Sequence, residues 1–555
     1  MEITLEESKA IRSLFAAMDA EMQPMRKHWA DLARAYLPRR YTYLETPGTP
    51  PNLARNPTIL NGTGTKAARD LASGMMNGIT SPSRKWFRMW PGNKPVLRDR
   101  RLKAWLAEVE DVMMFAMSQS NFYKALAVMY LDLAIFGTAA MLIYEDSETI
   151  IHAYNPALGE FRLMQDHRQR VVGIAREFYM QVRQVVDQFG EENCSTRVRE
   201  AYKRGGGSWL QPVKVRHLIE PNTPPRSGMS KSFRWREWFW EADGGDREQV
   251  LRVGGFHEFP GACPRWELSG NYVYGGSPGM DALGDVLQLQ QETLVKAKGL
   301  EKGVDPALLA DVSLQNTKIS ASPSGITFVP GLARGQAGVV PVAPVNMPLG
   351  ELTLDIREVE NRIRDTFHND LFRMIANLDT VRSATEIDAR REEKLVLLGP
   401  VLERFENEAL DPALARIFNI CYRAGLIPPP PEGFEDVPIT IQYTSLLATA
   451  QRASNTVATE RLFGLIGNLA AVYPEVRHVP RVAELLVSYA DSIGVPADGI
   501  NSPEEVEKAK QEEAKAAQAA KTTEEVGVAV EGAKTLSETD VGGGMNALEA
   551  LMGGG

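Results

Sequence analysis

Two long helical stretches that bracket an extended insert constrain this chain more than any other feature of its sequence. The first covers residues 278–302, where Ser277 can cap the helix and Pro278 suits its first turn. The second covers residues 351–372, and its apolar side chains recur at helical spacing: Leu352, Ile356, Val359 and Ile363. We therefore expect two rods that each bury one narrow face, although either rod alone is also typical of a surface helix in a globular domain.

Residues 304–350, between the two rods, contain short apolar runs separated by glycine and proline, which indicates short edge strands. A third helix is predicted to begin at Ser383, because the sequence Ser-Ala-Thr-Glu that starts there has the pattern of a capping box. Gly399 and Pro400 fall in the middle of this helix. Since proline removes a backbone hydrogen bond, we expect the helix to kink there.

The flanking regions have more ordinary patterns. Residues 5–36 are expected to be helical, with one apolar face formed by Trp29, Leu32, Ala33 and Tyr36. Residues 150–266 are typical of antiparallel β-structure with one short helix near residues 183–189, and residues 446–491 are again helical. The expected strands are residues 171–178, 214–219, 232–241, 249–253 and 437–443.

Length and charge limit the classes of protein that this chain can represent. At 555 residues the chain should form roughly two to four structural units. Residues 503–555 hold eleven acidic and five basic residues, so they contribute −6 of the formal charge of −9 and leave the body nearly neutral. That tail cannot bury a core and is expected to be disordered. A nearly neutral body predicts weak or transient contact with nucleic acid.

The sequence also argues against several kinds of site. Cys194, Cys263 and Cys421 are far apart and form no C-x-x-C pair, so we predict no disulfide framework, no metal site and a reducing compartment. Residues 125–144 are apolar and about as long as a membrane span. Because Asp132 interrupts them, we expect a buried helix followed by a strand at residues 139–144, and no membrane partner.

The most suggestive catalytic motif is Gly275-Gly276-Ser277-Pro278-Gly279, which matches G-x-S-x-G between a short strand and a helix. A serine hydrolase using Ser277 is therefore one alternative. It is disfavoured because Pro278 has no N–H to donate to an oxyanion. His257-Glu258 lacks the second histidine of a zinc protease motif. We predict no catalytic residue and no cofactor.

Two further motifs invite a nucleic-acid or nucleotide interpretation. The glycine-rich turn at residues 61–65 lacks the spacing of a phosphate loop, which disfavours ATP binding. Trp86 and Phe87 lie beside basic residues and would suit base stacking in a monomeric nucleic-acid-binding protein. Packing anchors are the more frequent role of such aromatic residues.

Taken together, an ordered series of short motifs resembles the portal proteins, or head-to-tail connectors, of short-tailed bacteriophages. The series extends over about residues 25–507, and Gly276 departs from it because this family is expected to have a basic residue there. The motifs, in chain order, are Leu71-Ala72-Ser73-Gly74, Thr80-Ser81-Pro82-Ser83, Trp86-Phe87, Ser120-Asn121-Phe122, Phe136-Gly137-Thr138, Phe256-His257-Glu258-Phe259-Pro260, Arg265-Trp266, Tyr274-Gly275-Gly276-Ser277-Pro278, Ala384-Thr385-Glu386-Ile387 and Leu398-Gly399-Pro400.

The resemblance implies an α+β multidomain portal fold. Its parts would be a β-containing wing, a two-helix stem, a β-rich clip, a kinked tunnel helix, an α-helical crown and a disordered C-terminal tail. In this chain the wing would be residues 1–275, the stem helices 276–303 and 351–373, the clip 304–350, the tunnel loop with the kinked helix and the return to the wing 374–445, the crown 446–502, and the tail 503–555.

The resemblance also implies a function. Such a chain would form a ring of about twelve subunits at one capsid vertex of the virion, assembled in the host cytoplasm. The ring would conduct double-stranded DNA during packaging and ejection, and it could nucleate procapsid assembly. Its implied partners are the large terminase subunit, the tail adaptor protein, the major capsid protein and the scaffold. ATP hydrolysis would belong to the terminase, so the chain itself would be no enzyme.

Within such a ring, charged residues of the stem and of the tunnel loop are candidates for the surface that faces DNA. For any one of these residues, an ion pair between subunits is an equally good interpretation. The candidates are Lys296, Lys298, Lys302, Arg357, Arg362 and Arg364 on the stem, and Asn377, Asp379 and Arg382 in the loop.

Overall fold

The computed structural model describes residues 5–40, 44, 59–92, 100–223, 233–242, 250–304, 308–310, 339–341, 349–371, 399–434 and 438–444, with a few isolated positions after residue 461. The chain divides into two compact units. One contains Met1–Lys94 and Arg100–Gln451, and the other contains Pro95–Asp99 and Arg452–Gly555. All the helices and strands named below belong to the first unit. The expected crown, the acidic tail, and most of the third helix from Ser383 lie outside the described residues.

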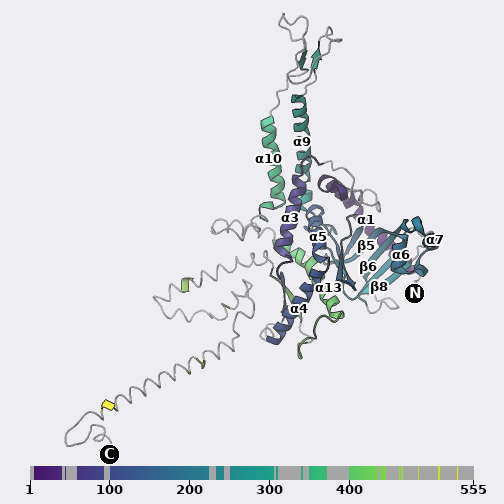
Figure 1. Ribbon diagram of the computed structural model, residues 1–555, viewed down its shortest axis with the longest axis vertical. Coiled ribbons are helices and arrows are strands. Elements are labelled where there is room, and N and C mark those ends of the chain that lie inside the picture. The colour runs from purple at the N-terminus through teal and green to yellow at the C-terminus, as the bar shows by residue number, and fades with distance from the viewer. Residues whose placement is uncertain are drawn as a thin grey trace, which may run out of the picture. The chain divides into compact units, whose positions relative to one another are not determined.

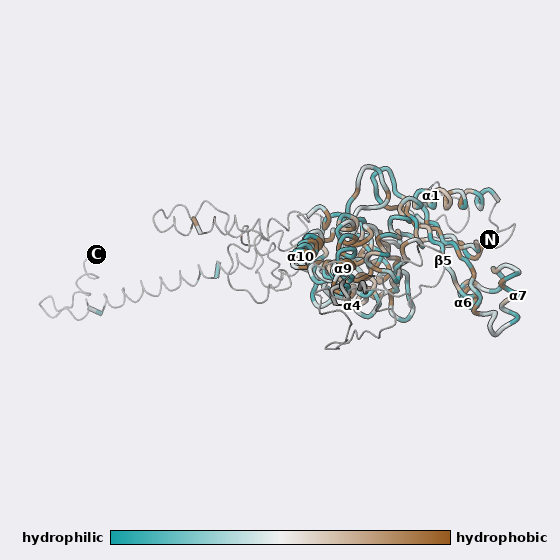
Figure 2. The backbone as a smooth tube through the Cα atoms, turned by 90° about the horizontal axis from the view of Figure 1, so that it is seen from above, coloured by the Kyte–Doolittle hydropathy of each residue, from teal (hydrophilic) through white to brown (hydrophobic). Residues whose placement is uncertain are grey.

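The N-terminal part is helical, as the sequence predicts. Helix α1 spans Leu5–Tyr36 and buries its predicted apolar face, and brown and teal alternate along it in Figure 2. Helices α3 (Thr63–Ile79), α4 (Arg100–Gln119) and α5 (Phe122–Phe136) follow. Helix α5 and strand β2 (Met141–Asp146) account for the apolar run at residues 125–144. Among the described helices, none combines the length and apolar character needed to cross a bilayer.

Two antiparallel sheets hold most of the strands in the described part of the chain. The larger has the order β4-β5-β6-β7-β8 and the smaller the order β3-β2-β9. The bounds are β3 Ile150–Tyr154, β4 Phe161–Gln165, β5 Val171–Gln181, β6 Pro212–Pro221, β7 Trp235–Glu241, β8 Val250–Phe256 and β9 Gly261–Ala262. Helix α1 packs on the larger sheet, with Phe15 and Met18 against Trp238 and Trp240. The predicted strands of this region are confirmed.

A second short helix in this region corrects the prediction of only one. Helix α6 (Val182–Phe189) lies where a helix was expected, and helix α7 (Thr196–Arg204) is additional. Only Val198 and Ala201 of α7 are buried, so its apolar pattern is too sparse to identify from sequence. Ser195 caps α7 by accepting the N–H of Val198 at 3.3 Å.

The C-terminal part of this unit returns to the N-terminal helices. Residues 399–405 are helical, Glu406–Leu410 form a π-helix, and α13 spans Asp411–Arg423. Strand β12 (Ile439–Tyr443) then pairs with β1 (Phe87–Pro91) across more than three hundred residues of sequence. Gly399 and Pro400 begin this described stretch, so the expected kink, which depends on the residues before them, stays a prediction.

Two helices project together from the other elements (Figure 1). Helix α8 (Pro278–Asp281) leads into α9 (Leu283–Val304), and α10 (Leu349–Thr366) runs back beside α9. We call α9 and α10 the helix pair. Beyond its ends, β10 (Leu308–Ala310) and β11 (Val339–Pro341) form an antiparallel two-stranded sheet inside the insert, where short strands were expected.

The structure corrects both predicted rods. A turn at Ala282 interrupts the first rod, which was expected to be one helix. The second was expected to reach residue 372, but α10 ends at Thr366. The backbone of His368 adopts the left-handed conformation, with φ of 52°, and this turns the chain out of the helix. Phe367 and Leu371 are nevertheless buried on either side of the turn.

A buried row of polar side chains crosses the larger sheet. Arg176 on β5 donates from Nε to Nδ1 of His217 on β6 at 3.1 Å, so the proton of a neutral His217 lies on Nε2. That nitrogen faces Oε1 of Glu237 on β7 at 3.1 Å. His217 is wholly buried and stacks on Phe239, with ring centroids 4.0 Å apart. Burial and the charge of Arg176 lower the pKa of His217 to about 4.

This row predicts a loss of stability in mild acid. An unfolded chain protonates His217 near pH 6.5, whereas the folded chain does so only near pH 4. The free energy of unfolding should therefore fall as the pH drops through this window, by up to about 3 kcal/mol from this residue alone. Urea unfolding at pH 7.5 and at pH 5 measures this change. Between the two pH values, the free energy of unfolding should fall less in His217→Gln than in the parent chain. Equal losses in the two proteins would contradict this assignment.

Candidate functional site

The helix pair is anchored by the turn that precedes α3. The side chain of Gln290 on α9 accepts the backbone N–H of Leu60 at 2.7 Å and donates to the carbonyl of Asn61 at 2.8 Å. Asn61 in turn donates from Nδ2 to Glu360 on α10 at 2.9 Å. The glycine-rich turn that resembles a phosphate loop therefore holds α9 and α10 in place.

Close packing explains a glycine in the same turn. A Cβ atom on Gly64 would approach Cγ2 of Val286 on α9 to 2.9 Å, closer than side chains pack. Val286 and Leu289 on α9 and Val359 and Ile363 on α10 are buried in this region. The start of α9 and the end of α10 therefore belong to a packed core, to which α3 contributes.

The G-x-S-x-G motif joins the helix pair to α5. Ser277 is 2 % exposed, and its hydroxyl accepts the N–H of Met280 at 3.1 Å and donates to the carbonyl of Ile135 at 2.7 Å. A Cβ on Gly279 would meet the same carbonyl oxygen at 2.6 Å. Pro278 occupies the first position of α8. Ser277 therefore caps a helix, and neither of its hydrogen bonds involves a histidine, so the geometry gives no support to a hydrolase.

The candidate cations of the helix pair fall into two groups. Arg362 forms an ion pair with Asp285 on α9 at 3.0 Å, and Arg364 pairs with Glu360 at 3.0 Å. The other four have no ion-pair partner among the described residues: Lys296, Lys298, Lys302 and Arg357. Asn377, Asp379, Arg382 and Ser383 lie outside the described part of the chain. The ion pairs thus separate Arg362 and Arg364 from the other four cations of the helix pair.

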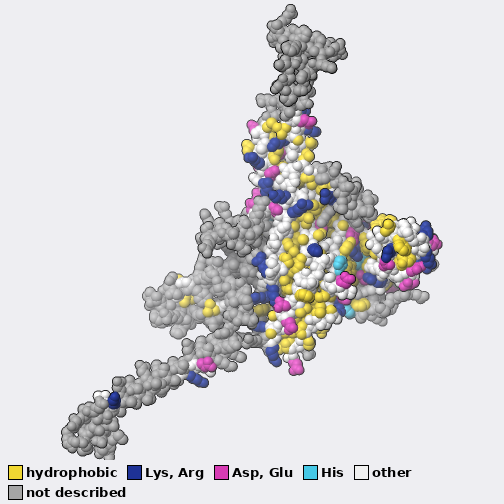
Figure 3. Space-filling view, in the orientation of Figure 1, with side chains coloured by type: hydrophobic (Ala, Val, Ile, Leu, Met, Phe, Trp, Pro, Cys, Tyr) yellow, Lys and Arg dark blue, Asp and Glu magenta, His cyan; other side chains and the backbone are white. Residues whose placement is uncertain are grey.

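The helix pair also exposes large apolar side chains, and Figure 3 shows yellow and dark blue groups mixed over its visible face. Leu287, Val295 and Leu300 on α9 are 55, 48 and 47 % exposed, and Leu354 on α10 is 64 % exposed. Single exposed leucines are common on protein surfaces, but these four lie on two adjacent helices that project together from the other elements, which makes the helix pair a candidate interaction surface.

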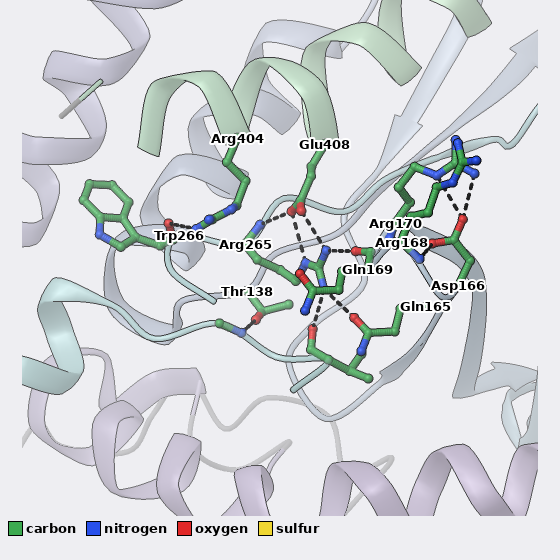
Figure 4. A network of polar contacts seen from close by, with 12 residues as sticks. Thr138, Gln165, Asp166, Arg168, Gln169, Arg170, Arg265, Trp266, Arg404 and Glu408 are labelled. Atoms are coloured by element: carbon green, nitrogen blue, oxygen red, sulfur yellow. Dashed lines mark hydrogen bonds and ion pairs between the residues drawn. The ribbon is translucent and has the colours of Figure 1, made fainter. Parts of the chain in front are cut away.

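Arg265 organises a polar junction that sequence reasoning missed (Figure 4). Its side chain is fully buried, and its Nη2 and Nε donate to the two carboxylate oxygens of Glu408 at 2.7 and 3.1 Å. Nη1 donates to Gln165 at 3.0 Å and to the carbonyl of Val273 at 3.2 Å. Nη2 also donates to the carbonyl of Gln169. The planar guanidinium thereby donates hydrogen bonds to three separate stretches of chain.

The junction connects elements that are far apart in sequence. Gln165 and Gln169 belong to the β4–β5 hairpin, Val273 lies just before α8, and Glu408 lies in the π-helix. π-Helices are uncommon and occur often at functional sites, and here the irregular turn carries the carboxylate that meets Arg265. A sequence motif, Arg265-Trp266, marks this position, but its partner, Glu408, is more than a hundred residues away and has no local signal.

A second ionic cluster involves the His257-Glu258 segment. Glu258 pairs with Arg423 on α13 at 2.9 Å and also with Arg416, which is buried. Although burial raises the pKa of Glu258, the two arginines hold it below its ordinary value. This carboxylate therefore serves an ion-pair cluster. Among the described residues, no group of three or more potential ligands is arranged to hold a metal ion.

The three cysteines have the character of structural thiols. All three are free and buried. Burial raises the pKa of Cys194 to about 11, of Cys263 to about 12 and of Cys421 to about 11. They are protonated at neutral pH and poorly nucleophilic.

The junction yields a stability prediction. Glu408→Ala would leave the buried Arg265 charge without its carboxylate, which should lower the free energy of unfolding by about 3 kcal/mol or more. Glu403→Ala is the matched control, because Glu403 is exposed in the preceding helical turn. This substitution should change the free energy of unfolding by less than about 0.5 kcal/mol. Denaturant unfolding of both variants measures the difference. Similar small effects in both would show that the junction does not stabilise the fold.

Comparison with known proteins places this geometry in context. Residues 8–500 match the family model described as "Bacteriophage head to tail connecting protein". The "Portal protein" of Salmonella phage epsilon15 is 37% identical over 538 residues, which is 96% of each chain. The "Probable portal protein" of Bordetella phage BPP-1 is 37% identical over 492 residues, which is 88% of each chain.

Similarity to solved structures is weaker. The chain in "Neck of empty GTA particle computed with C6 symmetry" is 10% identical, with a TM-score of 0.35, over 77% of this chain and 94% of that one. At this level of similarity it contributes nothing to the assignment.

Proposed function

Because this chain belongs to the bacteriophage head-to-tail connecting proteins, we propose that it is the subunit of a portal ring that conducts double-stranded DNA through one vertex of a phage capsid. About twelve subunits would form the ring, as is typical of this family. The helix pair is the observation that assigns this function to particular residues. It exposes large apolar side chains, and four of its cations form no ion pair within the described part of the chain.

In this proposal the helix pair is the stem. A single subunit leaves Leu287, Val295, Leu300 and Leu354 partly in water, which forgoes part of the roughly 1.5–3 kcal/mol that full burial of such a side chain provides. A neighbouring stem in a ring would cover them. The contact would be heterologous, with different faces of α9 and α10 meeting, and such contacts close into rings when the rotation allows.

The stem cations outside these ion pairs are the proposed contacts to DNA. Lys296, Lys298, Lys302 and Arg357 are available for phosphates, whereas Arg362 and Arg364 are engaged within the subunit. A channel must release each phosphate as the duplex advances, so a few cations per subunit on a nearly neutral body suit transit better than a strongly basic surface. Ion pairs between subunits are the alternative role for these residues.

For the segments outside the helix pair, the proposed roles are those implied by the resemblance to portal proteins. We propose that the insert at residues 304–350 is the clip, which would dock the large terminase subunit during packaging and then the tail adaptor. The sheets and N-terminal helices would form the wing, which would meet the major capsid protein and scaffold and could nucleate procapsid assembly. Asn377, Asp379 and Arg382 would lie in the tunnel loop, and residues 446–502 would form the crown. Assembly would take place in the host cytoplasm.

The stem contact can be tested by ring formation. Leu354→Asp places a charge on the proposed contact, so the variant should remain smaller than a ring under conditions in which the parent chain assembles. Leu210→Asp is the matched control, because Leu210 is 65 % exposed but lies outside the helix pair. Light scattering measures the mass of each. Rings of Leu354→Asp as stable as those of the control would contradict a stem contact at this position.

The channel assignment can be tested by salt dependence. On assembled rings, Lys298→Gln with Lys302→Gln should make the plot of log affinity for linear duplex DNA against log salt shallower, by about 0.9 for each phosphate that the variant no longer neutralises. Arg362→Gln with Arg364→Gln removes the same charge from residues paired within the subunit and should leave this slope unchanged. An unchanged slope in the lysine variant, or failure of that variant to form rings, would instead favour ion pairs between subunits.

A further inference from the structure

A groove of about 450 Å³ lies between α1 and the larger sheet, and its lining includes no residue of the helix pair or of the Arg265 junction. One wall is a polar face of α1, and the other is formed by side chains of β4, β5 and β6. Ala16 and Ala20 of α1 face the groove, and both are exposed. Small side chains at these two positions keep the groove open.

The groove is basic within a chain that is acidic overall. Its lining includes two carboxylates, Asp19 and Glu177, and five cations: Arg12, Arg26, Arg162, Lys214 and Arg216. The lining therefore carries a formal charge of +3, in a chain whose formal charge is −9. A concave surface that concentrates one sign of charge attracts ligands of the opposite sign.

The two carboxylates hold the cations in position. Arg162 pairs with Asp19 at 2.5 Å, while Lys214 and Arg216 both pair with Glu177, at 3.3 and 2.8 Å. Glu177 and Arg216 are directly opposed across β5 and β6. Arg162 and Arg216 also stack on the ring of Phe15, at 5.1 and 4.8 Å from its centre. Arg162, Lys214 and Arg216 are thus each held by a carboxylate, which reduces the conformational entropy that a ligand would have to remove.

We propose that this groove binds a carboxylate-rich peptide segment of a partner protein. The inference does not depend on the portal function. The volume suits a few side chains, within the range of pockets that bind small ligands. A nucleic acid strand is less suitable because every one of its residues carries a phosphate, and some would have to lie against Asp19 and Glu177. An acidic peptide can place carboxylates on the arginines and neutral groups near those two residues.

Calorimetric titration of the full-length protein with an octaglutamate peptide tests the proposal. Ala20→Trp fills the groove without changing its charge, and Ala17→Trp is the matched control on the exposed part of α1 outside the groove. We expect Ala20→Trp to weaken octaglutamate binding on the order of tenfold, equivalent to about 1.4 kcal/mol, and Ala17→Trp to leave it unchanged.

A second pair of variants separates this groove from general attraction to positive charge. Arg12→Gln with Lys214→Gln removes two groove cations, and Glu177 retains Arg216 as a partner. Arg183→Gln with Arg204→Gln removes two exposed cations elsewhere on the same unit. Binding should weaken only in the first variant. Equal binding by Ala20→Trp and its control, or by the two charge variants, would overturn the proposal. The proposal would also be overturned if a DNA octanucleotide bound instead of octaglutamate and Ala20→Trp weakened that binding.

Discussion

A guanidinium that is wholly removed from water must find its hydrogen-bond partners inside the protein, and Arg265 finds them on three stretches of chain. Its carboxylate partner, Glu408, lies in a π-helix that leads into α13. The same guanidinium bonds the carbonyl of Val273, only a few residues before the cap at Ser277. The segment that leads into the helix pair, the β4–β5 hairpin and the π-helix before α13 are therefore joined through one buried charge.

Much of this architecture follows from local pattern. Helix α1, the apolar run divided into α5 and β2, and the strands of the larger sheet all lie where periodicity and turn residues predict them. Local pattern fails where tertiary contacts decide. The left-handed residue His368 ends α10 early, and α7 has too few buried residues to show an apolar stripe. The partnership of Arg265 with Glu408 depends on folding across more than a hundred residues, so no local signal reveals it.

The candidate site shows the same division. The sequence identifies Ser277 and Pro278 as the start of a helix, and the structure shows why Gly279 follows them, because a Cβ atom there would meet the carbonyl oxygen of Ile135 on α5 at 2.6 Å. Sequence alone treats the six cations of the proposed stem alike. Geometry separates Arg362 and Arg364, which neutralise carboxylates of the same subunit, from the lysines and Arg357. An ordered series of motifs predicts the family more directly than any single residue does, and the family match over residues 8–500 confirms it.

The central claim is that the helix pair forms the wall of a channel at the centre of a ring. Single-particle electron microscopy of the assembled full-length protein tests it most directly. The account predicts a closed ring in which α9 and α10 of every subunit surround the central opening, with Leu354 covered by a neighbouring subunit. A ring whose opening is lined by the larger β-sheet, with the helix pairs pointing outward, would contradict it.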